Sequence, residues 1–372
     1  MIYLDNNATT PLDKEVADAM SEAFRFFGNP SSTHKHGEAA KAIIESARCN
    51  VATLIGASPP EILFTSGGTE ANNLAIIGTA YSHEKGHIIT SSIEHPAVLN
   101  PVKWLASKGF DETILAVGSD GRVNPDDLRR AVRKDTILIT VMHSNNETGV
   151  LQPIAEIADV AKEFGIPFHT DAAQSVGKMA VSVQDFGVGM LTIVPHKFYG
   201  PKGCGALYIK NGIELKPILF GAGHERGLRP GTENIIGIAG LGKACEIAAR
   251  DISCRYDYAK NLRNLLYGLL KESLDMQLNG HADLRLPNTL NASIKGIMAD
   301  DIVTALKNEV AFSAGSACHA GVRNPSAVLK AMGLSDKDAL SSVRLSVGKD
   351  NSEDETREAA ARIIAYVKTK SL

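Results

Sequence analysis

Short apolar runs alternate with longer amphipathic stretches over much of the chain. The strand-like runs lie at residues 87–90, 113–116, 136–142 and 166–169. The stretches with helical apolar spacing lie at residues 96–108, 125–133 and 153–164, and each begins at or near a proline. This alternation predicts an α/β fold, with a mostly parallel sheet that is covered by helices on both faces.

Further elements precede and follow this core pattern. A short strand within residues 1–11 leads into a helix at 12–27 and a polar loop at 28–37. Later elements are strands at 61–65, 205–210, 288–294 and 342–347, a long helix at 235–271 and a shorter helix at 298–307. The charge-rich segment 250–258 indicates a solvated connector. We therefore predict a large domain at 12–250 and a small α+β domain formed by 1–11 and 251–372.

The charge composition indicates which classes of binding partner to expect. The 372 residues include 39 Lys and Arg against 42 Asp and Glu, with a formal net charge of −3 and no sustained basic stripe. Nucleic acid is therefore not expected as a partner. The N-terminus lacks a basic region followed by an apolar run, and no segment offers about 18 uncharged apolar residues. These features predict a soluble cytoplasmic protein without a membrane partner.

The cysteines favour a reducing compartment. The five cysteines, at positions 49, 204, 245, 254 and 318, show no Cys-x-x-Cys spacing and no tight cluster with histidine. A disulfide framework is therefore not expected. His34 and His36 could bind a metal, but without further ligands a solvated turn is favoured, and we predict no metal site.

Polar, chemically capable residues follow four of the predicted strands. Glu94 and His95 follow the run at 87–90, residues 143–149 follow 136–142, and residues 171–174 follow 166–169. His196 and Lys197 follow a further short apolar, strand-like run that begins at Thr192. In sheets of this kind, ligands bind at the carboxyl ends of the strands. Their recurrence at four strand ends predicts a functional site along that edge.

A glycine-rich turn follows the strand at 61–65. Ser66, two glycines and Thr69 open a helix there, so that backbone N–H groups and a hydroxyl could bind an anion. Neither a Walker A motif nor a Gly-x-Gly-x-x-Gly fingerprint is present, which argues against nucleotide binding. The turn is typical of a phosphate cradle, with an ordinary capped turn as the alternative.

Lys197 and Asp171 suit the chemistry of pyridoxal phosphate. A lysine amine forms a Schiff base with the aldehyde of this cofactor, and a carboxylate keeps the pyridine nitrogen protonated. Lys197 follows Asp171 by 26 residues, and both end strand-like runs. Lys197 and Asp171 alone do not establish this cofactor. The commoner alternative is that His196 and Lys197 are an ordinary pair of residues in a surface loop.

Two C-terminal features could act on a substrate. Cys318 lies in a loop at 312–326 that is rich in Gly, Ala and Ser, which favours an accessible thiol and a mobile backbone, with a buried free cysteine as the alternative. Arg344 lies in a predicted strand, where its planar fork could hold a carboxylate, with a surface salt bridge as the alternative.

Taken together, these motifs resemble the cysteine desulfurases of the NifS and IscS kind, which belong to the aspartate aminotransferase-like fold type I of pyridoxal-phosphate enzymes. The resemblance spans nearly the whole chain. It rests on residues 4–11, 29–34, 65–73, 94–95, 145–149, 171–174, 196–197, 229–232 and 315–318. It implies a seven-stranded, mostly parallel sheet in the large domain and pyridoxal 5'-phosphate as cofactor.

The resemblance assigns roles around the cofactor ring. It implies that Lys197 forms the Schiff base, that Asp171 pairs with the ring nitrogen and that His95 stacks on the ring. It also implies that Gln174 and Asn145 lie near the ring hydroxyl.

Further roles concern the phosphate and the substrate. His196 and the pair Gly68 and Thr69 would contact the phosphate. Thr232 resembles the residue that the family contributes to the partner subunit's phosphate site, which implies a homodimer. Arg344 would bind the substrate carboxylate with help from Asn145, and Cys318 would attack the substrate sulfur.

Some features depart from the desulfurase pattern. Many desulfurases carry a serine three residues before the lysine, where this chain has Val194. Residues 192–200, 229–234 and 317–319 look closer to selenocysteine lyases, whereas Pro325, seven residues after Cys318, indicates the longer active loop of housekeeping desulfurases.

The resemblance therefore predicts an enzyme that converts L-cysteine to L-alanine and passes sulfur through a persulfide to an acceptor protein, as in iron–sulfur cluster biosynthesis. One alternative is a selenocysteine lyase that acts on L-selenocysteine. A second is a non-catalytic pyridoxal-phosphate-binding or sulfur-relay protein.

Overall fold

The computed structural model describes residues 1–314, 316–319 and 322–370, with side chains described outside 315–323. Its largest sheet has seven strands in the order β2-β8-β7-β6-β5-β3-β4, and only β8 runs antiparallel to its neighbours within this sheet. The strands are β2 (Ile62–Thr65), β3 (His87–Ser91), β4 (Asp111–Leu115), β5 (Thr136–Thr140), β6 (Phe168–Asp171), β7 (Met190–Ile193) and β8 (Gly205–Ile209). The predicted α/β fold with a mostly parallel seven-stranded sheet is confirmed.

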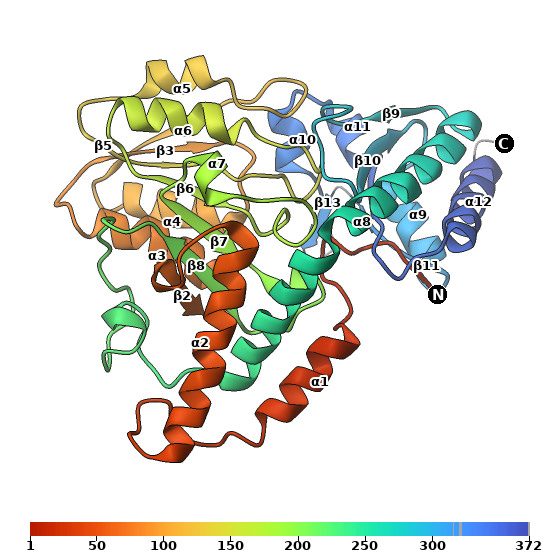
Figure 1. Ribbon diagram of the computed structural model, residues 1–372. Helices are drawn as coiled ribbons and strands as arrows, with labels where there is room; N and C mark the ends of the chain where they lie inside the picture. Colours follow the sequence, from red (N-terminus) through yellow and green to blue (C-terminus); the bar gives the residue numbers. More distant parts are fainter. Residues whose placement is uncertain (315, 320–321, 371–372) are drawn as a thin grey trace.

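Helices cover both faces of this sheet (Figure 1). They include α3 (Gly68–Ala80), α4 (Pro96–Ala106), α5 (Pro125–Ala131), α6 (Ile154–Glu163) and α7 (Val183–Phe186). Neighbouring strand residues point to opposite faces. Ile88 therefore packs with α3 and α4, whereas Ile89 packs with α6 in a separate cluster. This double coverage explains why the strands read as continuous apolar runs.

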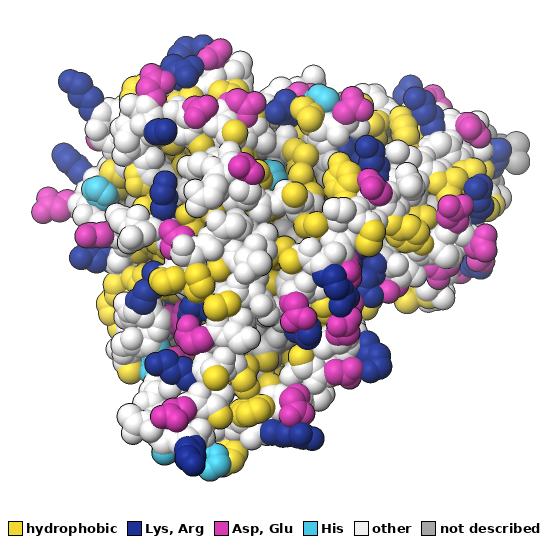
Figure 2. Space-filling view, in the orientation of Figure 1, with side chains coloured by type: hydrophobic (Ala, Val, Ile, Leu, Met, Phe, Trp, Pro, Cys, Tyr) yellow, Lys and Arg dark blue, Asp and Glu magenta, His cyan; other side chains and the backbone are white. Residues whose placement is uncertain are grey.

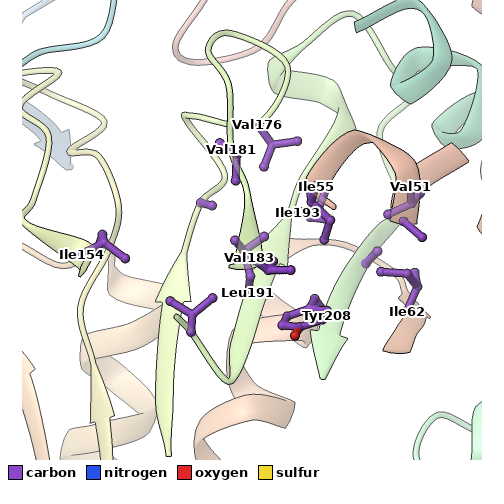
Figure 3. Close-up of a cluster of buried hydrophobic side chains, with 14 of the residues drawn as sticks. Val51, Ile55, Ile62, Ile154, Val176, Val181, Val183, Leu191, Ile193 and Tyr208 are labelled. Carbon is purple, nitrogen blue, oxygen red and sulfur yellow. The ribbon is translucent and has the colours of Figure 1, made fainter. Parts of the chain in front are cut away.

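The face that packs against α6 holds the larger core. Figure 3 shows Ile62, Leu191, Ile193 and Tyr208 from the sheet beside Val51 and Ile55. The last two come from α2 (Lys35–Ile55), a helix that the sequence reading did not identify. The buried side chains of α2 tie the N-terminal region to this face of the sheet.

Three helices form the lower part of the molecule in Figure 1: α1 (Lys14–Ala23), α2 and the first half of α8 (Ile235–Ser273). Gly242 permits close contact between α2 and α8, because a Cβ at that position would lie 2.5 Å from Ala47 Cβ. The predicted polar loop at 28–37 is shortened, since α2 already begins at Lys35. His34 caps this helix, and its Nδ1 accepts a hydrogen bond from Gly37 N at 3.3 Å.

The C-terminal third builds a smaller antiparallel sheet in the order β12-β15-β10-β9. Its strands are β9 (Met276–Leu278), β10 (Thr289–Ile294), β12 (Ser313–Ala314) and β15 (Ser342–Ser346), and its helices are α9 (Ala299–Leu306), α10 (Ala327–Ala331), α11 (Asp336–Leu340) and α12 (Glu353–Lys370). The N-terminal strand β1 (Ile2–Tyr3) pairs with β11 (Val310–Ala311). The first residues of the chain therefore lie beside its last third.

Helix α8 connects the two regions. Leu241 and Cys245 belong to the large core, whereas Leu266 and Leu270 belong to the cluster around the small sheet. The predicted boundary near residue 250 falls inside this helix. We propose that two domains meet within α8, with residues 1–11 joining the smaller one.

A two-stranded sheet lies within the segment that was predicted as the cysteine loop. Its strands are β13 (Ser316–His319) and β14 (Val322–Pro325), and the backbone of Cys318 pairs with that of Arg323. The loop prediction is corrected to this extent, because residues 316–319 and 322–325 form paired strands. The Cys318 side chain lies outside the described residues.

The surface and the helices add two observations. Figure 2 shows Lys and Arg side chains interspersed with Asp and Glu over the visible face, without a stripe of one sign. Within the described ranges, no helix is long and apolar enough to cross a bilayer.

Candidate active site

A cavity of about 350 Å³ lies at the carboxyl ends of the central strands. His95 reaches it from the loop after β3, Ser144 from the loop after β5, Asp171 from the end of β6 and Lys197 from the turn after β7. These side chains, which were predicted from the strand ends, therefore line one cavity. Arg344 enters the same cavity from the small sheet.

Lys197 lies in the short 3-10 helix Pro195–Lys197, directly after β7. Its Nζ donates to the carbonyl oxygens of Asn7 at 2.8 Å and Ala8 at 2.7 Å. Burial, together with the positive charge of Arg344, lowers the pKa of Lys197 to about 8. A larger fraction of neutral amine at pH 7 makes this lysine a better nucleophile and base than a surface lysine.

Asp171 is buried at the carboxyl end of β6, with 7% of its surface exposed. Its Oδ2 accepts a hydrogen bond from Asn72 Nδ2 at 2.7 Å, and its Oδ1 accepts one from Ala173 N at 2.9 Å. These two donors fix the plane of the carboxylate at the cavity wall. The Oδ1 atom of Asn72 is buried without a hydrogen-bond partner among the described residues.

His95 caps the N-terminus of α4, and its Nδ1 accepts a hydrogen bond from Ala97 N at 3.1 Å. In the neutral ring, the proton therefore resides on Nε2. Although the ring opens to the cavity, desolvation by the surrounding protein lowers the pKa of His95; the charge of Asp171 acts in the opposite direction, and that of Lys197 adds a smaller lowering. A neutral ring is suited to stack on a flat ligand without adding charge.

The N-terminus of α3 reaches the cavity through Gly68 and Thr69. Within the described part of the chain, no side chain caps this helix, so its first N–H groups remain available to an anion. Gly68 is required here, because a Cβ at this position would lie 2.6 Å from Val194 Cγ2. Val194 therefore packs against the turn where the resemblance leads one to expect a serine hydroxyl.

The amide of Asn145 is engaged within its own turn. Its Oδ1 accepts hydrogen bonds from the backbone N–H groups of Glu147 and Thr148, both at 2.9 Å, and its Nδ2 donates to Ile93 O at 3.0 Å. Asn145 is fully buried, and Asn146 lines the cavity instead. We therefore transfer to Asn146 the ligand contact that was predicted for Asn145.

Gln174 also lines the cavity. Its Nε2 donates to Asn7 O at 2.9 Å, and its Oε1 accepts from Lys178 Nζ at 2.7 Å. Gln174 is 4% exposed, so these contacts fix its side chain firmly. A ligand in the cavity would meet an amide whose orientation is already set.

Arg344 lies at the centre of β15 and points into the cavity from the small sheet. Its Nη2 donates to Asp5 Oδ1 at 2.7 Å and to Ser313 Oγ at 3.0 Å, while its Nη1 donates to Asn146 O at 3.2 Å. Its Nε is buried and has no hydrogen-bond partner among the described residues. The guanidinium thus has a fixed plane and retains an unused donor.

His196 and Thr232 differ in their relation to the cavity. His196 lines it, and its Nδ1 lies 3.2 Å from Thr9 Oγ1. Burial and the neighbouring lysines lower the pKa of His196 to about 4, so its ring is neutral near pH 7. Thr232 is exposed and does not line the cavity of its own chain.

The structure also identifies cavity residues without a role in the sequence reading: Asn7, Asn72 and Asn146. Asn7 lay within the motif at residues 4–11, and Asn146 was adjacent to a predicted residue. The sequence does not show that the backbone oxygen of Asn7 accepts hydrogen bonds from Gln174 and Lys197, which lie more than a hundred residues away in the chain.

Glu94 lies behind His95 and is almost completely buried. Its Oε1 accepts hydrogen bonds from Ser91 Oγ at 2.6 Å and Met142 N at 2.9 Å, whereas its Oε2 is unpartnered among the described residues. Burial raises the pKa of Glu94 to about 8. The carboxyl group is therefore mostly protonated in the folded protein at neutral pH.

This raised pKa predicts a pH-dependent stability. An acid with a folded-state pKa above its unfolded value stabilises the fold below the unfolded pKa, and this contribution is lost as pH rises through the folded pKa. The free energy of unfolding of the wild type, minus that of Glu94→Gln, should therefore decrease as the pH is raised from about 5 to about 8. Urea unfolding of the cofactor-free proteins measures it, with the exposed Glu156→Gln as control. An equal difference at both pH values would contradict the assignment.

Comparisons with known proteins agree with this geometry. Residues 2–358 match the family model described as aminotransferase class-V. The chain is 45% identical over 378 residues to the cysteine desulfurase IscS of Dictyoglomus turgidum, covering 100% of this chain and 96% of the relative. It superposes on a structure described as a NifS-like protein with a TM-score of 0.93, 35% identity and 99% coverage of both chains. A structure described as SspA in complex with cysteine gives a TM-score of 0.84 and 39% identity over 94% of this chain and 99% of that one.

Proposed function

This chain belongs to the class-V aminotransferase family, and from that premise we propose that it is a pyridoxal-phosphate-dependent cysteine desulfurase. It converts L-cysteine to L-alanine and transfers the sulfur to a cysteine of its own. The observation that carries the proposal is the meeting of Lys197, Asp171 and Arg344 in one cavity of about 350 Å³, within a chain that matches desulfurases along its length. The relative described as SspA was solved in complex with cysteine, which supports the choice of substrate.

The residues of the cavity fit pyridoxal phosphate. The uncapped N-terminus of α3 provides N–H groups for the phosphate, and Asp171 offers a fixed carboxylate for a protonated pyridine nitrogen. The unpartnered Oδ1 of Asn72 is a further polar group beside that carboxylate. Lys197 would hold the cofactor covalently through Nζ, and His95 would cover one face of its ring.

The chain's own residues divide the reaction between them. When bound, the cofactor supplies an electron-withdrawing ring that accepts charge from the substrate Cα. Lys197 Nζ takes the proton from Cα and later returns a proton to the product, a role suited to an amine with a pKa of about 8. Arg344 holds the substrate carboxylate. The Cys318 thiolate attacks the substrate sulfur, so that an S–S bond forms while the substrate C–S bond breaks.

Substitution of Arg344 tests the carboxylate contact. Arg344→Lys keeps the positive charge beside Asp5 but loses the planar fork, so we expect KM for L-cysteine to rise at least about tenfold with a smaller change in kcat. Steady-state alanine release measures both constants. The matched control is Arg250→Lys on the exposed face of α8, which should leave both unchanged. An unchanged KM in Arg344→Lys would refute the contact.

Val194 leads to a prediction about the phosphate. Val194→Ser would place a hydroxyl beside Gly68, so we expect pyridoxal phosphate to bind about threefold to tenfold more tightly. Titration of the cofactor-free protein measures this affinity. Val194→Ala is the control, because it removes the same methyl groups without adding a donor. Equal affinities of the Ser and Ala variants would show that the phosphate does not reach Val194.

The assembly and the setting of the reaction are further parts of the proposal. We propose a homodimer in which Thr232 reaches the phosphate site of the other subunit, which agrees with its exposure outside the cavity of its own chain. We also propose a protein acceptor for the sulfur and a reducing cytoplasmic setting. The four cysteines with described side chains, Cys49, Cys204, Cys245 and Cys254, are free thiols, as such a setting requires.

Removal and return of the cofactor test the function directly. The purified protein should release alanine from L-cysteine, lose this activity when pyridoxal phosphate is stripped, and regain it on reconstitution. Parallel assays with L-selenocysteine address the lyase alternative, and a strong preference for that substrate would overturn our choice. Absence of alanine from both substrates would favour a binding or relay protein.

A further inference from the structure

A second lysine lies behind the cavity and has no part in the reaction described above. Lys178 donates from Nζ to Gln174 Oε1 at 2.7 Å and to Asn7 Oδ1 at 2.9 Å. Its side chain is part-buried, and its amine is surrounded by protein. The charged groups that act most strongly on it are Lys197 and Arg344, both positive, and no carboxylate among the described residues forms an ion pair with it.

A buried amine next to two cations destabilises the fold unless its N–H groups are used. Two N–H groups of Lys178 are used on two side-chain amides. Both hydrogen bonds run from Nζ to an amide oxygen, and an ammonium group with three N–H donors or a neutral amine with two can make them. The NH₂ groups of Gln174 and Asn7 must then point elsewhere.

The consequences reach the cavity through both amides. With Oε1 held by Lys178, the Nε2 of Gln174 donates to Asn7 O at 2.9 Å, and Gln174 is one of the residues that line the cavity. With Oδ1 held by Lys178 and Asn288, the Nδ2 of Asn7 donates to Thr289 Oγ1 at 2.9 Å and Asn146 O at 3.2 Å. Asn7 also supplies the carbonyl that accepts from Lys197 Nζ. One amine thus controls the orientation of a ligand-facing amide and of the residue that holds the reactive lysine.

We propose that Lys178 is a positioning residue for the cofactor: it sets the orientation of the Gln174 and Asn7 amides, so that Gln174 presents an N–H donor to the cofactor ring. The inference rests on the proposed function and concerns the same cavity. It assigns a role to a part-buried lysine that is not among the residues lining the cavity.

The experiment is a double-mutant cycle on the affinity of the cofactor-free protein for pyridoxal phosphate. Lys178→Met keeps the length of the side chain but removes its donors, and we expect binding to weaken about fivefold to tenfold. In a Gln174→Met background, the same change should cost clearly less, because only the contact of Lys178 with Asn7 is then left to lose. Lys178→Arg retains donors and should restore most of the affinity, since a cavity of about 30 Å³ beside Lys178 leaves room for the larger head group.

Two controls distinguish the orientation of the amides from a general effect of positive charge and from a loss of folding. Lys202→Met removes an exposed positive charge that acts on His196 without contacting either amide, and it should leave affinity unchanged. Thermal unfolding of each cofactor-free variant reports on the fold. If Lys178→Met does not fold, Gln174→Glu tests the same contact with Lys178 intact: a carboxylate should raise the unfolding temperature through its pairing with Lys178, and weaken cofactor binding through the lost N–H.

The proposal would be overturned if Lys178→Met bound pyridoxal phosphate as tightly as the wild type, or if it lost the same affinity with and without Gln174. It would also be overturned if Gln174→Glu matched the wild type in unfolding temperature and cofactor affinity. Failure of the wild-type protein itself to bind pyridoxal phosphate would instead refute the proposed function. The two failures are therefore distinguishable in one set of titrations.

Discussion

Replacement of Lys197 by alanine is expected to abolish alanine release from L-cysteine, with a fall in rate of at least about 10³-fold. The variant loses the covalent attachment of the cofactor and the group that moves the Cα proton, and general acid–base transfer alone typically contributes about 10²–10⁴-fold. We also expect the visible absorbance of lysine-bound cofactor to disappear. The fold should survive, because the change removes a buried amine whose pKa is already lowered by desolvation.

Borohydride reduction followed by peptide mapping checks this assignment. In the wild type, the cofactor should be trapped on the peptide that contains Lys197. Lys202→Met is the matched control, since it removes an exposed lysine near the cavity and should leave the adduct on Lys197. A reducible lysine adduct that persists in Lys197→Ala would disprove the role of Lys197.

The second large effect is expected from Cys318→Ala. This variant should bind pyridoxal phosphate like the wild type, because every cofactor contact derived above lies outside β13 and β14. It should lose most alanine production from L-cysteine, since no thiolate remains to accept the sulfur. Selenocysteine turnover should be affected less, because a selenium leaving group depends less on nucleophilic assistance.

The other cysteines provide controls for this result. Cys204 and Cys245 are buried, and burial raises the pKa of both thiols, to about 12 for Cys204, so neither is a reactive thiolate at pH 7. Cys49 and Cys254 are exposed, but they lie on α2 and α8 rather than at the cavity. Each replacement should leave alanine release unchanged. Undiminished turnover in Cys318→Ala, or an equal loss from another cysteine, would remove Cys318 from the mechanism.

Much of the large sheet could be predicted from the sequence, because its inner strands are buried on both faces and read as apolar runs, several of them between proline-led helices. Lys197 and Asp171 could be located for the same reason, since residues that end neighbouring strands meet at one edge. The helix α2 was missed although its buried Ala40, Ile44, Ala47 and Val51 follow helical spacing. The polar segment before it obscured where the helix begins.

The exact set of residues at the cavity could not be predicted, because it is decided by contacts that the local sequence pattern does not reveal. The turn at 145–149 folds back on the amide of Asn145 and leaves Asn146 at the cavity, a difference of one residue that is decided by turn geometry. Asn7 and Lys178 acquire their roles from partners far away in sequence. The roles of both residues can be recognised only in the folded protein, where Asn7 of the N-terminal segment contacts Lys178 and Lys197.

The most direct test of the central claim is a single turnover of the wild-type enzyme with L-cysteine and no reductant, followed by mass analysis of the cysteine peptides. We predict one alanine for each added sulfur, with the extra sulfur on the peptide that contains Cys318. Alanine without a sulfur adduct on that peptide, or an adduct located on another cysteine, would contradict the account.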